Sequence, residues 1–226
     1  MDTKRANSQS PDFELDHFFV TVSGAESGSP AVEAAGFITS ASHPHPGQGT
    51  ASRGVLFENA YLEFLWLTEP EEADSPFVRR TRLKERIDPS SGACPFGIGL
   101  RKKGNDYTRL PFQTWGYRPP YLPEGLSFLM SVSSVDLGEP LVFFLPWLVG
   151  PSRPGEEHPN GARRVTKINI ILEGDAAGSE TLTALSEASV ASFRTGSSYF
   201  MDVEVDGGRS MKSLDLRPEI PLRLNW

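Results

Sequence analysis

The sequence predicts an α+β protein in which two βαβββ modules flank a central insertion. The chain has 226 residues, of which 38% are hydrophobic and 23% charged, a balance typical of a globular domain with a full core. Its 19 prolines and 21 glycines favour many turns and short strands over long helices. The same predicted order of strands and helix opens and closes the chain, which indicates an internal repeat.

The first predicted module spans residues 13–67 and follows a polar stretch, residues 1–12, that we expect to be a flexible tail. Its strands are rich in aromatic and β-branched residues. Its helix has a serine N-cap, a proline at the first helical position and a glycine stop. The predicted elements are a strand at 13–22, a helix from Ser29 to Gly36, a strand at 37–43, and a hairpin at 53–67 that turns at 58–60.

The insertion, residues 68–162, has a different composition. Acidic residues precede Ser75 and Pro76, a predicted helix start, and arginines and lysines follow at 79–86. We interpret these cations as a solvated helix face, with an anion-binding stripe as the alternative. Strands are predicted at 96–102, 126–132 and 139–149, with a proline-rich aromatic loop at 111–125 and a linker at 150–162.

The second predicted module, residues 163–226, repeats the plan of the first. Alanine, leucine and valine recur in it at helical spacing after a serine N-cap. The predicted elements are a strand at 164–174, a helix at 179–190 that begins at Ser179, and strands at 197–208, 210–218 and 220–226.

Four stretches carry a resemblance to a known family. They are "LDHFFVTV" (15–22), "HPGQGTASR" (45–53), "YLEFLWL" (61–67) and "HPNGARRVTKINIIL" (158–172). Their order and spacing resemble the vicinal oxygen chelate superfamily, and the first module is similar to its glyoxalase-like domains. The resemblance implies that the modules form a cupped sheet of mixed and antiparallel strands, with helices outside and a ligand pocket between the cups. It also implies a divalent metal held by inward-facing residues on the first and fourth strands of each module.

His17 and Glu63 fall on the metal positions of the first module. Successive side chains of a strand point to opposite faces of the sheet. Alternation therefore places His17 and Glu63 towards the pocket, and Phe18 and Phe64 behind them.

In the second module, Lys167 aligns with His17, and Arg223 aligns with Glu63. Lysine and arginine are protonated at neutral pH and offer no lone pair to a cation. A divalent metal would therefore have an incomplete ligand set, His17 and Glu63 with waters. We expect instead that the two cations face the two residues of the first module, in a charge cluster that binds an anion or a carbonyl oxygen. The alternative is a structural ion-pair network between the modules.

Two loops add candidate ligand contacts. His45 or Arg53, around two glycines, would contact the ligand, with a plain β-turn as the alternative. Trp115 and Arg118 lie on the proline-stiffened loop and would cover a planar or acidic ligand, with a seam between modules as the alternative. No catalytic role is expected for Cys94, His43 or His158.

The bulk properties limit the partners and the compartment. A formal net charge of -7 argues against nucleic acid as a partner. The single cysteine cannot form an intramolecular disulfide, and residues 1–15 have no apolar stretch of the signal-peptide kind, so we expect a cytoplasmic protein. The longest apolar run, residues 141–149, is about half a membrane span. Exposed sheet edges favour a homodimer, although no residue fixes the oligomeric state.

The sequence thus predicts a glyoxalase-like protein that binds a small oxygen-rich or anionic metabolite between its modules. As an enzyme it would be a lyase, an isomerase or a dioxygenase, with His17 and Glu63 as bases or ligands. The alternatives are a non-catalytic protein that sequesters a small molecule, as antibiotic-resistance members do, and a dimeric scaffold with a degenerate pocket.

Overall fold

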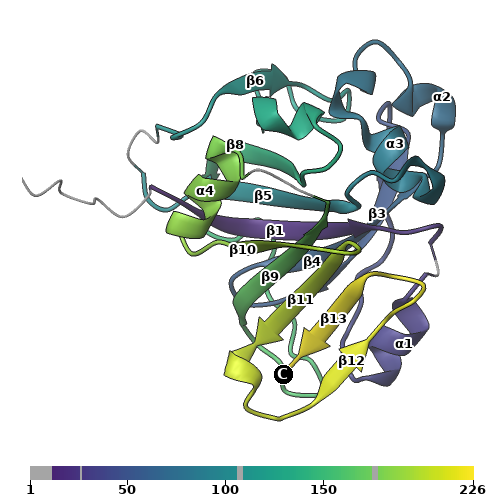
Figure 1. The fold of residues 1–226 in the computed structure, drawn as a ribbon, viewed down its shortest axis with the longest axis vertical. Coiled ribbons are helices and arrows are strands. Elements are labelled where there is room, and N and C mark those ends of the chain that lie inside the picture. The colour runs from purple at the N-terminus through teal and green to yellow at the C-terminus, as the bar shows by residue number, and fades with distance from the viewer. Residues whose placement is uncertain (1–11, 26, 106–108, 175–177) are drawn as a thin grey trace, which may run out of the picture.

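The computed structural model describes residues 12–25, 27–105, 109–174 and 178–226, and residues 1–11 of the predicted tail lie outside them. The strands of the described residues form two sheets, one of eight strands and one of five (Figure 1). Together with short helices they confirm the predicted α+β class.

The eight-stranded sheet, here the first sheet, consists of two halves with the same strand arrangement. In each half the first and fourth strands are parallel neighbours, and the two first strands pair antiparallel at the centre of the sheet. The order across the sheet is β2 (His43–His45), β3 (Thr50–Leu56), β4 (Tyr61–Leu67), β1 (Phe13–Thr21), β5 (Phe96–Lys102), β8 (Leu141–Val149), β7 (Phe128–Ser131) and β6 (Thr114–Tyr117).

The five-stranded sheet, here the second sheet, is built entirely from the C-terminal part of the chain. Its order is β10 (Ser192–Gly196), β9 (Val165–Glu173), β11 (Phe200–Val205), β13 (Leu222–Asn225) and β12 (Ser213–Asp215). The structure thus differs from the sequence prediction in one respect that decides the site. Residues 96–149, expected to lie in an insertion, complete the first sheet, and residues 163–226 form a sheet of their own. The repeat was hard to see because no helix is found in the described residues between β5 and β6.

The helices are short, and their bounds are α1 (Ser29–Ala34), α2 (Pro70–Ala73), α3 (Leu83–Ile87) and α4 (Glu180–Glu187). Ser179 caps α4 as predicted, since its Oγ accepts a hydrogen bond from the amide of Leu182. The helix predicted from Ser75 is interrupted, because Arg82 adopts a left-handed conformation with φ of 58°. The second predicted strand, 37–43, is wrong, because β2 overlaps it only at His43, and the edge strands β6 and β10 were not predicted.

The two sheets pack face to face around one apolar core. Phe18, Leu62 and Ile98 of the first sheet share this core with Ile168 and Val203 of the second, and all five are at most 2% exposed. In Figure 1 the strands β9, β11 and β13 cross the strands β1 and β5 at a steep angle. The opposite face of the first sheet is therefore free to carry a separate cluster of side chains.

The turn between β3 and β4 joins the two sheets. The Asn59 side-chain amide donates to the carbonyl oxygen of Val165 over 2.9 Å and accepts from the amide of Val165 over 3.0 Å. Glu58 forms ion pairs with Arg163 and Arg164 just before β9. The predicted hairpin turn thus also fixes the start of the second sheet.

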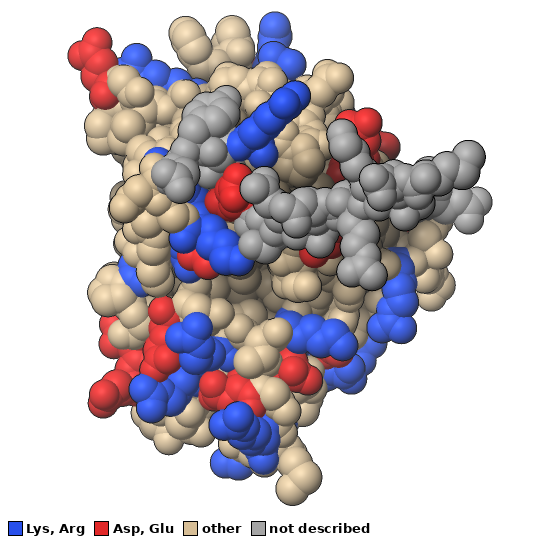
Figure 2. All heavy atoms as spheres, turned by 90° about the vertical axis from the view of Figure 1, so that its left-hand side faces the viewer, with Lys and Arg blue, Asp and Glu red and all other residues tan. Residues whose placement is uncertain are grey.

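The surface carries charges of both signs. Figure 2 shows one side of the molecule, on which lysine and arginine side chains alternate with aspartate and glutamate. This face has no patch of a single sign of the kind that binds a polyanion. Within the described residues, no helix has the length and apolar character needed to cross a membrane.

Candidate functional site

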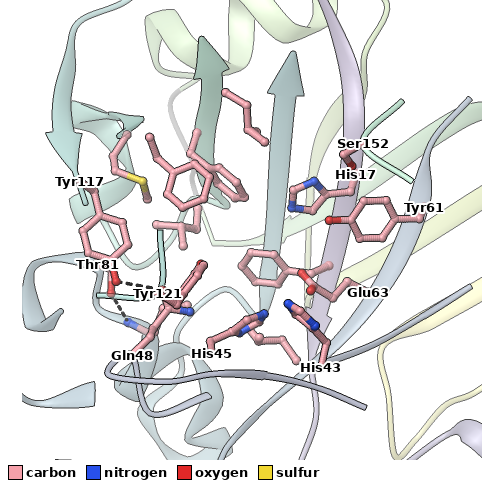
Figure 3. Close-up of a pocket in the computed structure, with 18 of the residues that line it drawn as sticks. His17, His43, His45, Gln48, Tyr61, Glu63, Thr81, Tyr117, Tyr121 and Ser152 are labelled. Carbon is pink, nitrogen blue, oxygen red and sulfur yellow. Dashed lines mark hydrogen bonds between the residues drawn. The ribbon is translucent and has the colours of Figure 1, made fainter. Parts of the chain in front are cut away.

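A cavity of about 260 Å³ lies on the face of the first sheet that is turned away from the second sheet (Figure 3). Strands β1 and β4 of the first half and β6, β7 and β8 of the second half contribute to its wall. Its polar lining residues are His17, His43, His45, Gln48, Tyr61, Glu63, Thr81, Tyr117, Tyr121, Ser152 and Arg153. Its apolar lining residues are Phe19, Leu65, Leu83, Phe128, Met130, Leu141, Phe143 and Leu145.

Asp16 and His17 form a buried hydrogen-bonded pair at the cavity. The register between β1 and β5 shifts between Leu15 and His17, so Asp16 sits at a bulge. A bulge re-aims side chains, and here the Nδ1 atom of His17 lies 2.7 Å from the Oδ2 atom of Asp16 although the residues are adjacent in a strand. An ionised carboxylate only accepts, so Nδ1 carries the proton, and in the neutral ring the lone pair is on Nε2.

The carboxylate of Asp16 is held by several donors. The backbone amide and the hydroxyl of Ser152 donate to it over 3.0 and 2.8 Å, and Nη1 of Arg101 lies 3.4 Å from Oδ1. Burial alone would raise the pKa of Asp16, but the hydrogen bonds from His17 and Ser152 outweigh it, and the pKa is lowered. Asp16 therefore stays ionised and fixes the orientation of the imidazole.

The His17 ring is clamped between its neighbours. It stacks on the Tyr61 ring with centroids 4.6 Å apart, and its edge contacts Phe143. On β5, Gly99 lies in register with His17, and a Cβ atom at Gly99 would be only 2.5 Å from Cε1 of His17. Glycine is therefore required where the ring crosses β5, and Figure 3 shows the ring and Tyr61 side by side at the cavity.

Glu63 brings a charge to the same wall. It lies on β4 in register with Phe19 of β1, it is 7% exposed, and it lines the cavity. Among the described residues its carboxylate has neither a hydrogen bond nor an ion pair within 4.0 Å. The negative charge raises the pKa of Tyr61 further than burial alone does, so the Tyr61 phenol keeps its proton. Residues 61–67 are apolar except for Glu63, and the charge of Glu63 thus belongs to the cavity and not to the core.

Strand β2 and the loop after it supply the opposite side of the cavity. The Nδ1 atom of His45 lies 2.9 Å from Oγ1 of Thr50, and its ring stacks on Tyr121. Burial lowers the pKa of His45, and Glu63 opposes this shift only in part. His45 is therefore predominantly neutral at pH 7.

Arg153 contributes the cation of the cavity. It follows Ser152 in the connection between the two sheets and is half-buried, with its Cζ atom 5.1 Å from the centre of the Tyr61 ring. Its guanidinium forms no ion pair with any side chain in the described parts of the chain. The site therefore combines a free carboxylate, a free guanidinium and three histidines at one end of an apolar hollow.

Comparison with known families identifies the fold. A family model described as "Glyoxalase-like domain" matches residues 15–186, more than half of the chain. The chain belongs to the glyoxalase-like domain family. A search of curated protein sequences finds no match to this glyoxalase-like protein.

Several solved structures are similar to the glyoxalase-like protein. A hypothetical protein from Staphylococcus aureus matches with a TM-score of 0.55 and 11% identity over 94% of this chain and 98% of that chain. A mutant of 4-hydroxymandelate synthase from Streptomyces coelicolor matches with a TM-score of 0.46 and 12% identity over 89% and 75% of the two chains. Methylmalonyl-CoA epimerase from Mycobacterium tuberculosis matches with a TM-score of 0.38 and 13% identity over 66% and 95%. At these identities the first likeness shows the fold alone.

The glyoxalase-like protein lacks the metal ligand set that its resemblance implies. No group of three His, Cys, Asp or Glu side chains in the described ranges is placed to hold a metal ion. In the second half of the first sheet, the strand that matches β1 presents Gly99 opposite His17, and the strand that matches β4 presents Leu141, Phe143 and Leu145 to the cavity. None of them offers a lone pair, so His17 and Glu63 stand without the two ligands expected from the other half. The residues present do not fit a tightly held divalent metal.

The predicted cations of the charge cluster lie elsewhere. Lys167 is exposed on β9, opposite Glu204 of β11. Arg223 donates to Asp202 over 2.8 Å on the second sheet. The predicted cluster is therefore wrong, because the face of the second sheet opposite the core meets solvent and not the cavity. The cation that lines the cavity together with Glu63 is instead Arg153.

Of the other predicted contacts, only His45 lines the cavity. Arg53 lies in register with Phe64, on the core side of β4, so it points away from Glu63. Trp115 packs behind the cavity wall with the guanidinium of Arg80 4.1 Å from its ring centre. Arg118 is exposed and does not line the cavity. The aromatic loop contributes Tyr117 and Tyr121 in their place.

Sequence reasoning missed several residues of the site. Asp16 was hidden because a regular strand would point it away from His17, and no residue pattern marks the bulge. Ser152 and Arg153 lie in a stretch that composition assigns to a linker. His43 was given no role, yet it lines the cavity beside His45. Pro151 and Pro154 restrict the backbone on both sides of Ser152 and Arg153, and this is the one feature of the sequence that marks the segment.

Proposed function

We propose that the glyoxalase-like protein binds a small oxygen-bearing or anionic metabolite in this cavity and transfers a proton on it, as a lyase or isomerase does, with His17 as the base. The single observation that carries the proposal is the Asp16–His17 pair beside the free carboxylate of Glu63. A neutral imidazole with its Nδ1–H bonded to a carboxylate has its basic nitrogen in a fixed direction.

The surroundings of His17 support this role. Asp16 stabilises the imidazolium that would form when Nε2 takes up a proton. The stacked Tyr61 ring and Gly99 limit the rotation of the imidazole, so little reorganisation is needed at the moment of transfer. Glu63 lies on the next strand and is available to accept or return a proton on the same side of the ligand.

The shape and charge of the cavity limit the ligand. A volume of about 260 Å³ lies just below the range of about 300–1,000 Å³ that is typical of ligand pockets, which suits a small metabolite. Arg153 is placed to bind a carboxylate or another anionic group at the polar end. Phe19, Phe128 and Phe143 would hold an apolar part of the ligand at the other end.

The test combines a ligand panel with variants. The panel contains the glutathione hemithioacetal of methylglyoxal, catechol and 2-oxobutanoate, and binding is followed as a rise in melting temperature. For a compound that is turned over, Asp16→Asn and His17→Gln should each lower kcat by about 10²- to 10⁴-fold. Lys167→Met is the matched control and should keep full activity. Equal activity of the His17 variant and the control would refute the assignment.

A non-catalytic binding protein is the second candidate. The observation that favours it is the apolar end, where Phe128 and Phe143 pack edge to face and would hold a ligand without any chemistry. A sequestering protein should gain melting temperature with a panel compound and convert none of it. In that case Phe128→Ala should weaken binding more than Asp16→Asn does.

A further inference from the structure

A chain of hydrogen bonds runs behind the cavity from β6 to His45. The hydroxyl of Tyr117 donates to Oε1 of Gln48 over 2.8 Å, and Nε2 of Gln48 donates to Oγ1 of Thr50 over 2.8 Å. Oγ1 of Thr50 lies 2.9 Å from Nδ1 of His45. All four residues are buried, and the bonds join strands β6, β3 and β2 through Gln48 of the loop after β2.

The direction of each bond is determined by the chemistry of its partners. The Tyr117 phenol keeps its proton because burial raises its pKa, and Gln48 is its acceptor. The Gln48 amide must then turn its NH₂ group to Thr50, since a side-chain amide nitrogen only donates. The Thr50 hydroxyl accepts this bond, and its own proton has one neighbouring acceptor in the chain of bonds, Nδ1 of His45.

The opposite arrangement would be costly. If Nδ1 of His45 carried a proton, the Thr50 oxygen would accept from two donors and its buried O–H would be left without an acceptor. Nδ1 is therefore the acceptor. In a neutral imidazole the proton is then on Nε2, and no described residue accepts a hydrogen bond from that atom.

We propose that His45 is a hydrogen-bond donor to the bound ligand through Nε2–H, and that Tyr117, Gln48 and Thr50 are positioning residues that hold it in this tautomer. This deepens the proposed function and rests on it. His17 presents a lone pair to the cavity, and His45 presents an N–H. The ligand class that fits is a small molecule with an acceptor oxygen, as in a carbonyl or carboxylate group, next to an acidic hydrogen.

The loop that follows His45 and carries Gln48 is anchored to α2. The amides of Gly47 and Gly49 donate to Oε2 of Glu72 on α2, over 2.7 and 3.1 Å. Both glycines have positive φ, and a Cβ atom at Gly49 would meet backbone atoms of α2 at under 3 Å. The chain of bonds is therefore anchored at both ends, on α2 and on β6.

The test reads the protons directly in the ligand-free protein. Nitrogen-15 NMR of the imidazoles at pH 7 should show His45 protonated on Nε2 and bare on Nδ1. Gln48→Glu replaces the NH₂ group by an acceptor of nearly the same shape, which turns the Thr50 hydroxyl round and should place a proton on Nδ1 of His45. Gln113→Glu adds the same charge at an exposed residue and should leave His45 unchanged.

Three outcomes overturn the positioning role of Tyr117, Gln48 and Thr50. They are a wild-type His45 protonated on Nδ1, a wild-type Nε2 without a proton, and a Gln48→Glu protein that melts like the control while its Nδ1 stays bare. If Gln48→Glu fails to fold, Tyr117→Phe serves in its place. It frees the amide of Gln48 to rotate and should produce a second, Nδ1–H population of His45.

The ligand arm separates this proposal from the proposed function. Addition of 2-oxobutanoate to the wild-type protein should move the Nε2–H resonance of His45. A rise in melting temperature without any such movement would overturn the donor role alone. If no panel compound raises the melting temperature, the proposed function fails, and the donor role of His45 that rests on it fails too. The tautomer measurement in the ligand-free protein still decides whether Tyr117, Gln48 and Thr50 are positioning residues.

Discussion

The two halves of the first sheet have the same strand arrangement but different side chains at the cavity. On the central strands, His17 of the first half lies in register with Gly99 of the second. On the fourth strands, the first half presents Tyr61 and Glu63, whereas the second presents Leu141 and Phe143. On these strands one half therefore carries the histidine and the carboxylate proposed to transfer a proton, and the other lines the cavity with apolar side chains. A repeated scaffold need not repeat its chemistry, and a glycine can matter because it makes room for the residue opposite.

The largest effect is expected from Asp16→Ala, which removes the anchor of the reactive half. The change leaves the buried Nδ1–H of His17 without its acceptor and removes the hydrogen bonds that Ser152 and Arg101 make to the carboxylate, and losses of this kind cost about 3 kcal/mol in total. Urea unfolding measures the loss. Asp215→Ala removes an exposed carboxylate and should cost about 0.5 kcal/mol or less. Similar costs for the two variants would contradict the structural role of Asp16.

Gly99→Ala tests the contribution of the second half. A methyl group there would overlap the His17 ring, and overpacking of this kind costs about 1–3 kcal/mol. The displaced ring should also lose its hydrogen bond to Asp16, which nitrogen-15 NMR would detect. Gly116→Ala on β6 has nothing within 4 Å of the new methyl group and is the matched control. A well-tolerated Gly99→Ala with an unmoved His17 would show that the two halves are less dependent on each other.

The pH dependence of stability sharpens the comparison between the cavity and the core. Burial is the largest cause of the pKa shifts of His45 and His158, and it lowers both pKa values. Near pH 6.5 and below, the unfolded chain therefore binds more protons than the folded protein. The free energy of unfolding should fall as the pH drops from 7.5 through this range. His45→Gln and His158→Gln should each remove part of the fall, which urea titrations at several pH values would measure.

The smallest effect is expected on the second sheet. Lys167→Met with Arg223→Met should change stability by no more than about 0.5 kcal/mol and leave the binding of any panel compound unchanged, because both side chains lie away from the cavity. Calorimetric titration checks this. If the double variant bound a panel compound more weakly, the sequence prediction that Lys167 and Arg223 line the pocket would be supported after all.

The sequence predicted the α+β class and the pocket side of β1 and β4, because strand alternation is a local property. Alternation placed His17 and Glu63 towards the pocket, whereas His45 was predicted from the glycine-containing stretch that follows it. The sequence prediction placed Lys167 and Arg223 at the pocket, where the structure has Arg153. The reason is that pairing between distant segments determines which strands share a sheet. The bulge at Asp16 and the course of the chain past Ser152 are tertiary features with no mark in the residue pattern. The role of Gly99 could not be seen either, since a missing side chain indicates nothing until its neighbour is known.

The hydrogen bonds from Ser152 to Asp16 have a mechanical consequence. Ser152 belongs to the connection that leads from β8 to β9, so the carboxylate beside His17 is held by a segment outside both sheets. The direction of the imidazole therefore depends on the course of this connection as well as on strand β1.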